Sequence, residues 1–226
     1  MDSQHRKAKN QTRPLLTRLA EYRNQYGTLA LIKKTIYRFI SPLIDYSDNL
    51  IFEWRGGKLP KIQARCPLDV AIGSQSDMTK IVDFYGCRED SPQVSKIRKR
   101  LAAGDKPYLA WSNTELVHIS WVSRRKKVEM KEIWGNLIFK ENQAYVYHCN
   151  TKSSFRGNHI FPVVLQQIIE DAHSSNLQQV FVSCRASNLA SSRGIQKAGF
   201  SLVRRLRALR IFGKKVGPKS IQIEKE

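Results

Sequence analysis

Apolar residues near the start of the chain recur at helical spacing, and the polar residues between them are mostly basic. Residues 13–40 follow this pattern, and Gly27 divides them into two candidate helices that Ser41 and Pro42 would end. Residues 50–57 combine a β-rich run with a glycine turn, which is typical of a short strand. The pattern therefore predicts a basic helical segment at the N-terminus, followed by a strand.

The rest of the chain alternates helix and strand signals. Residues 76–85 and 91–103 are expected to be helices, because a serine can cap each start and Pro92 suits a first helical position. Meandering strands followed by strand–helix repeats predict a mixed α/β (α+β) domain with one mostly antiparallel sheet flanked by helices. The other expected elements are two strands within 106–123, strands over 132–139, 143–151, 179–184 and 200–212, and helices over 162–174 and 189–198.

Composition limits the class of protein. The chain has 226 residues, of which 41% are hydrophobic, enough for one sizeable core. It has no run of about 18 apolar residues that could span a membrane, and it begins without the apolar core of a secretory signal. The four cysteines lie far apart in no metal-binding motif, so reduced thiols and no metal site are expected. These features predict a soluble cytoplasmic protein.

The net charge of +20, from 39 lysines and arginines against 19 acidic residues, implies a negatively charged partner. The basic N-terminal helices suit an anionic membrane surface, which would place the protein peripherally at the inner face of the membrane, or an acidic carrier protein. A solvated basic face is the simpler interpretation. Nucleic acid is less favoured, because the chain has no helix-turn-helix, zinc-finger or aromatic RNA-binding signature.

The stretch from Thr151 to Ala172 has the outline of a strand that turns into a helix. Such a joint directs unpaired backbone N–H groups and the positive end of the helix dipole at one point. A phosphate or pyrophosphate fits there, where Arg156 would add a charged donor and Gly157 would let the backbone approach closely. The stretch predicts an anion site, although a glycine at such a turn is common in α/β proteins.

A second stretch, residues 185–200, follows downstream. It predicts the end of a strand, a helix that begins after Asn188, and a Gly199-Phe200 pair that ends the helix. Asn188 would brace the loop between parallel strands, while Phe200 would return to the core. The alternative is that Asn188 only caps the helix and Gly199 only ends it.

In this order, "FRGNHI" and "SNLASSRGIQKAGF" resemble the R-x-x-G-x-G signature and the N-x-x-S…K-x-G-F segment of the GNAT superfamily of N-acetyltransferases. The resemblance extends over residues 106–213. It implies a GNAT-like acyltransferase domain over 66–226 after a basic helical extension over 1–65. It also implies acetyl-coenzyme A as acyl donor, with its pantetheine arm between two splayed strands. The cosubstrate-binding residues that it implies are Cys149, Asn150, Thr151, Arg156, Gly157, Asn158, His159, Ile160, Phe161, Asn188 and Ser191.

Three residues depart from the family pattern. His159 and Phe161 stand where glycines are usual, and because backbone N–H groups hold the phosphates, we expect them to serve with right-handed φ and ψ. Ile195 stands where many members carry a tyrosine that acts as general acid. The leaving thiolate is therefore expected to depart unaided or to take a proton through water.

An amine acceptor must lose a proton, so a general base within hydrogen-bond reach would help. His118 and Tyr145, on expected central strands, are the catalytic candidates, and Glu115, Glu132 and His148 are further ones. A lone strand histidine is more often structural. The expected acceptor is a primary amine of a small molecule or sugar precursor. The alternatives are an N-acyltransferase that depends on acyl carrier protein, and a basic nucleic-acid-binding module without catalysis.

Overall fold

The computed structural model describes Thr28, residues 43–217 and residues 220–222. Apart from Thr28, the helices expected over residues 13–40 lie outside the described residues. The chain divides into two compact units, residues 1–45 with 210–214, and residues 46–209 with 215–226. In the first unit, the backbone N–H of Phe212 donates to the carbonyl oxygen of Leu43 at 2.6 Å. The second unit contains the pockets described below.

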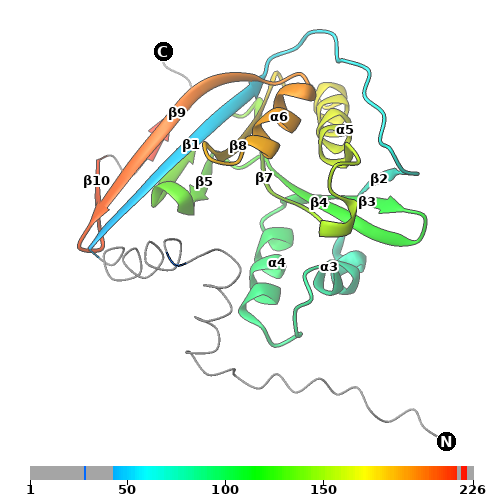
Figure 1. Ribbon diagram of the computed structural model, residues 1–226, viewed down its shortest axis with the longest axis horizontal. Coiled ribbons are helices and arrows are strands. Elements are labelled where there is room, and N and C mark those ends of the chain that lie inside the picture. The colour runs from blue at the N-terminus through cyan, green and yellow to red at the C-terminus, as the bar shows by residue number, and fades with distance from the viewer. Residues whose placement is uncertain (1–27, 29–42, 218–219, 223–226) are drawn as a thin grey trace, which may run out of the picture. The chain divides into compact units, whose positions relative to one another are not determined.

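The large sheet has eight strands in the order β10-β9-β1-β8-β7-β4-β3-β2 (Figure 1). The pairs β1–β8, β2–β3, β3–β4 and β4–β7 are antiparallel, and β7–β8 is parallel. This confirms the mixed α/β class and the mostly antiparallel sheet. The strands are β1 (Ile44–Trp54), β2 (Asp69–Ile72), β3 (Lys106–Ser112), β4 (Glu115–Ser123), β7 (Gln143–Thr151), β8 (Gln179–Arg185), β9 (Ser201–Ile211) and β10 (Lys214–Val216).

A second sheet has three strands in the order β11-β6-β5. The strands are β5 (Lys127–Met130), β6 (Gly135–Ile138) and β11 (Ser220–Gln222). The α-helices are α3 (Met78–Phe84), α4 (Pro92–Ala102), α5 (Ile160–Ser174) and α6 (Leu189–Lys197). In Figure 1, α5 and α6 lie together, and α3 and α4 lie together away from them.

Alternating side chains of the large sheet build a core on each of its faces, as strand geometry requires. On one face, Phe52 and Val146 pack with α5 and α6. On the other, Ile51 and Tyr145 pack with the small sheet, while Trp121 packs with α3 and α4. The strands that carry the site are therefore fixed from both faces.

Local signals set the ends of several helices. Ser91 caps α4 by accepting a hydrogen bond from the N–H of Val94, and Pro92 is the first helical residue, as predicted. The expected cap at Ser76 is wrong. Ser74 is the capping residue, and its own N–H donates to Asp77 at 3.0 Å. A short 3-10 turn over Gln75–Asp77 follows, so that α3 begins only at Met78.

Strand β1 changes the picture of the N-terminal part. The sequence placed residues 1–65 outside the acyltransferase-like domain, yet β1 pairs with β8 from Asn49–Arg185 to Trp54–Val180. Ile51 and Phe52 are fully buried, one on each face of the sheet. Residues 46–54 are therefore an inner part of the large sheet, which local patterns could not reveal because the partner strand lies far along the chain.

Candidate functional site

Strands β7 and β8 pair and then diverge. Their parallel pairing runs from Gln143–Gln179 to Val146–Val182. Beyond this point β7 continues beside β4, as far as Thr151, and β8 continues beside β1. The two strands thus separate toward their C-terminal ends, which is the splay that the family resemblance implied.

A bend at His148 redirects β7 where the separation begins. His148 has a φ of +50°, and the β4–β7 register shifts between Ile119 and Trp121 opposite it. Such a bulge breaks the alternation of side chains along a strand. Tyr147 packs toward α3 and α4, whereas Cys149, two residues later, packs against the core beneath α5. The bend therefore turns the last residues of β7 toward α5.

The chain then enters α5 through a tight turn. Gly157 has a φ of +86°, and His159 is the N-cap residue but makes no side-chain hydrogen bond to the helix. The first backbone N–H groups of any helix lack acceptors within the helix, here those of Ile160 and Phe161. Together with the helix dipole, they make the start of α5 favourable for an anion.

The expectation that His159 keeps a right-handed backbone is wrong. Its φ and ψ are +58° and 18°, in the left-handed region. That conformation costs a residue with a side chain about 1–2 kcal/mol. The turn thus requires a backbone conformation that glycine adopts freely, and a histidine holds it in this chain.

The turn, α6 and the end of β7 surround a pocket of about 580 Å³, here named the turn pocket. It brings together most of the residues singled out in the sequence. They are His118, Cys149, Asn150, Thr151, Arg156, Gly157, His159, Ile160, Phe161, Asn188 and Ser191. Sequence reasoning missed the other lining residues, which are Phe155, Pro162, Ala190, Arg193, Gly194 and Lys197.

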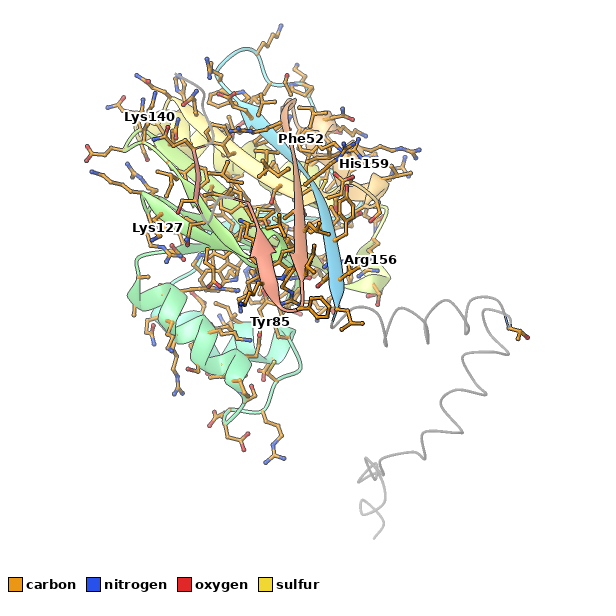
Figure 2. All side chains as sticks on the ribbon, turned by 90° about the vertical axis from the view of Figure 1, so that its left-hand side faces the viewer. Phe52, Tyr85, Lys127, Lys140, Arg156 and His159 are labelled. Carbon is orange, nitrogen blue, oxygen red and sulfur yellow. The ribbon has the colours of Figure 1, made fainter. Side chains whose placement is uncertain are left out.

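The turn pocket is positively charged near the start of α5. Arg156, Arg193 and Lys197 line it, and no carboxylate is among the described residues of its lining. The Lys197 ammonium lies 3.1 Å from Nε2 of His159. In Figure 2, Arg156 and His159 lie on one side of the ribbon, and Lys127 of β5 lies on the other. The cations and the free amides thus converge on one side of the sheet.

His118 is fully buried at the floor of the turn pocket. Its Nδ1 and Nε2 lie 2.7 Å from the hydroxyl oxygens of Thr151 and Ser120 respectively. Burial lowers the pKa of His118 to about 3, so the imidazole is neutral at physiological pH. Since both ring nitrogens are already hydrogen-bonded, the geometry favours His118 as a positioning group for Thr151 over His118 as a free base.

Two predicted residues lie apart from the turn pocket. Tyr145 is buried on the opposite face of the sheet, where its hydroxyl lies 2.5 Å from that of Ser183. Desolvation raises its pKa, so it remains a neutral phenol. The side-chain amide of Asn158 donates to the backbone carbonyl oxygen of Phe155, and the backbone carbonyl oxygen of Asn158 accepts from the backbone N–H of Arg65 at 3.0 Å. Asn158 therefore braces the turn.

Helix α6 closes the turn pocket. Asn188 caps α6 by accepting a hydrogen bond from the N–H of Ser191 at 3.1 Å, as expected for a helix cap. Both residues also line the turn pocket. A methyl group on Gly194 would lie 3.2 Å from Phe161, so glycine permits the close approach of α6 to the start of α5. Arg193 and Lys197 are four residues apart, which puts both on the same face of a helix. This spacing is the feature of the sequence from which their shared place in the pocket could have been predicted.

The described residues contain no cluster of three or more histidine, cysteine or acidic side chains arranged to hold a metal ion. Among the helices of this part of the chain, none is long and apolar enough to cross a membrane.

No protein-family model and no curated protein matches the chain. Solved structures do. An acetyltransferase of the GNAT family from Colwellia psychrerythraea matches with a TM-score of 0.52 and 17% identity over 72% of this chain and 56% of that one. A GNAT-family protein from Novosphingobium aromaticivorans matches with a TM-score of 0.52 and 15% identity, over 75% and 66%.

A GCN5-related N-acetyltransferase from Sphaerobacter thermophilus matches with a TM-score of 0.51 and 11% identity, over 91% of this chain and 71% of that one. The chain spans 56% and 66% of the length of the first two structures. At such low identity the likeness concerns the fold. With its splayed parallel strands and the turn into α5, this chain has the fold of the GNAT-family N-acetyltransferases.

Proposed function

We propose that the protein is an N-acyltransferase that transfers an acetyl or other acyl group from coenzyme A to a primary amine. The turn pocket carries this proposal, because it joins an anion-binding helix start to the diverging end of β7. The fold supports the same reaction class. A cytoplasmic location belongs to the proposal, since Cys66, Cys87, Cys149 and Cys184 are all free thiols.

The residues of the turn pocket fit coenzyme A. The amides of Ile160 and Phe161, with Arg156 and Lys197 beside them, would hold the pyrophosphate. The end of β7, from Cys149 to Thr151, would line the pantetheine arm. The thioester supplies an activated acyl group: the amine nitrogen forms the new C–N bond as the C–S bond breaks, the amine loses a proton and the thiolate gains one.

The buried groups around this arm are neutral and fixed. Desolvation raises the pKa of Cys149 to about 12, so its thiol does not compete with the acceptor as a nucleophile. His118 orients the Thr151 hydroxyl, and Phe161 stacks on the His118 ring at 5.8 Å. Ile195 is fully buried in the core beneath α6. Positioning would therefore contribute much of the rate.

Calorimetry with acetyl-coenzyme A, followed by thiol release over a panel of amines, tests the proposal. We expect saturable binding at one site and acceptor-dependent thiol release. Full-length folded protein that shows no heat with either acetyl-coenzyme A or free coenzyme A would exclude the cosubstrate and with it the reaction.

A further inference from the structure

A second pocket lies on the other face of the large sheet, between α4, β5 and the ends of β7 and β8. Its volume is about 500 Å³, which suits a small molecule. We name it the basic pocket. Its lining has two carboxylates, Glu129 and Glu132, against six basic side chains: Lys96, Lys99, Arg100, Arg125, Lys131 and Arg185.

Among these side chains, Arg100 gives the strongest indication of a bound anion. Its guanidinium lies over the rings of Trp121 and Tyr147, with centroid distances of 5.3 and 5.2 Å. Its Nη1 atom is buried without a hydrogen-bond partner, and among the described residues Arg100 forms no ion pair. A buried charged donor without an acceptor is costly, so an acceptor from a ligand would satisfy it.

Arg125, which lines the same pocket, differs from Arg100 because its guanidinium is paired with a carboxylate. It donates to both carboxylate oxygens of the buried Asp105, at 3.0 and 2.7 Å. The hydroxyl of Tyr147 donates to the same carboxylate at 2.5 Å. Asp105 thus balances the charge of Arg125, while among the described residues no carboxylate pairs with Arg100, whose guanidinium lies over the Tyr147 ring.

Helix α4 concentrates further charge beside Arg100. Lys96 is three residues from Lys99 and four from Arg100, so the three side chains share one helix face. Like charges at this spacing oppose helix formation unless an anion lies among them. The arrangement thus favours a ligand with a negatively charged group over a neutral one.

The basic pocket also approaches the turn pocket. His148 lines the basic pocket, and Cys149, the next residue, lines the turn pocket. The two pockets therefore reach the bend of β7 from opposite faces, where β7 and β8 separate. A molecule in one pocket would come close to a molecule in the other at this point.

We propose that the basic pocket binds the acceptor as a small amine that carries a phosphate or carboxylate group, with Arg100 as the main anion ligand and the amine directed to the bend at His148. This inference rests on the proposed acyl transfer, whose acceptor it specifies. Lys96, Lys99 and Lys131 contribute attraction, and the anion completes the hydrogen bonding of the Arg100 guanidinium.

Matched acceptor pairs test the charge requirement. Thiol release is measured with O-phosphoethanolamine against ethanolamine, and with β-alanine against its amide. We expect the anionic member of one pair to have a kcat/KM at least about tenfold higher, and the responding pair tells phosphate from carboxylate. Equal turnover within both pairs would overturn the inference.

Variants assign the preference to the pocket. Arg100→Gln should lower the preference at least about tenfold, mainly through KM, and should leave acetyl-coenzyme A binding unchanged. If Arg100→Gln folds poorly, Lys96→Gln replaces it as the test variant, because Lys96 is at an exposed position of α4. Lys96→Gln should lower the preference for the anionic acceptor by a smaller factor. Lys127→Gln on β5, outside the pocket, is the matched control. Retained preference in both folded variants would contradict the assignment.

An NMR titration of His148 separates this inference from the proposed function. Burial and the charges of Arg100, Lys131 and Lys96 lower the pKa of His148 to about 4, and Glu129 and Glu132 line the same pocket. Bound O-phosphoethanolamine or bound β-alanine should raise this pKa. A rise with either compound in protein that does not bind acetyl-coenzyme A would refute acyl transfer and support the pocket's ligand class. No rise with either compound in protein that binds acetyl-coenzyme A would count against the basic pocket alone.

Discussion

The turn pocket and the basic pocket both favour anions, but they are built differently. In the turn pocket, the central donors are backbone N–H groups at the start of α5, within one short stretch of sequence. In the basic pocket, the donors are long side chains from α4, from the residues Arg125 and Lys131 on either side of β5, and from the end of β8. A site made of backbone needs a particular turn, and a site made of side chains needs only that several elements meet. The first is visible as a motif, and the second is not.

Breaking the turn should produce the largest effect. Arg156→Glu with Gly157→Val removes a cation and places a branched side chain at a φ of +86°, so affinity for coenzyme A should fall at least about tenfold. Lys127→Glu is the charge control, and circular dichroism checks the fold. If the folded double variant binds coenzyme A normally, the turn is not the phosphate site.

Two of the three histidines that line the pockets, His118 and His148, should respond differently to acid. The folded state keeps His118 neutral, with a pKa of about 3, whereas the unfolded chain takes up the proton as pH falls through about 6.5. Stability is therefore lost as pH falls from about 6.5 toward 3, by about 2 kcal/mol for His118 between pH 7 and pH 5.

Urea unfolding at these pH values measures that loss, and His118→Gln should reduce its pH dependence. Burial and, after it, the charges of nearby cations lower the pKa of His148, so raised salt should reduce the part of the acid-induced stability loss that those cations cause. Raised salt should leave the loss caused by His118 unchanged, because burial alone lowers its pKa. An unchanged pH dependence in the folded His118→Gln protein would show that other groups cause the loss.

His159→Gly separates backbone from side chain within the turn pocket. Glycine relieves the left-handed strain at φ +58°, so the free energy of unfolding should rise by about 0.5–1 kcal/mol. If amides hold the phosphates, the affinity for coenzyme A should change by less than about threefold although the contact with Lys197 is lost. A much larger loss in calorimetry would assign the binding to the imidazole.

Deletion of residues 1–40 should have the smallest effect. Among the described residues, the one nearest the N-terminus in either pocket is Asn49, in the basic pocket. We propose that the folded acyltransferase domain begins close to β1, before Asn49. Both coenzyme A affinity and anion preference should then stay within about twofold, since every described pocket residue is kept. A truncated chain that fails to fold would place the boundary earlier.

Local chemistry explains what the sequence could predict. Ser91 and Pro92 mark the start of α4, while Gly199, with a φ of +98°, ends α6 and returns the buried Phe200 to the core. The turn residues around Gly157 could be named because a strand, a glycine and an apolar helix follow one another in a continuous stretch.

Long-range geometry explains what the sequence missed. The bend in β7 occurs at His148, which has a left-handed backbone, and no glycine marks it in the sequence. Tyr145 and Cys149 therefore pack on opposite faces of the sheet, although strict alternation would put residues four apart on the same face. The basic pocket was missed for a related reason. Arg100 and Arg185 belong to elements that only the folded sheet brings together.

The pairing of β1 with β8 has a consequence for synthesis on the ribosome. The side-chain amide of Gln179 in β8 donates to Glu53 in β1 across 126 residues of chain, so β1 cannot find its partner until most of the chain has emerged. Until then Ile51 and Phe52, which are fully buried in the folded protein, lack the partner strand that covers them, and exposed apolar segments of this kind favour aggregation of nascent chains. Productive folding should therefore depend on how quickly translation reaches β8, and on holdase chaperones when it stalls.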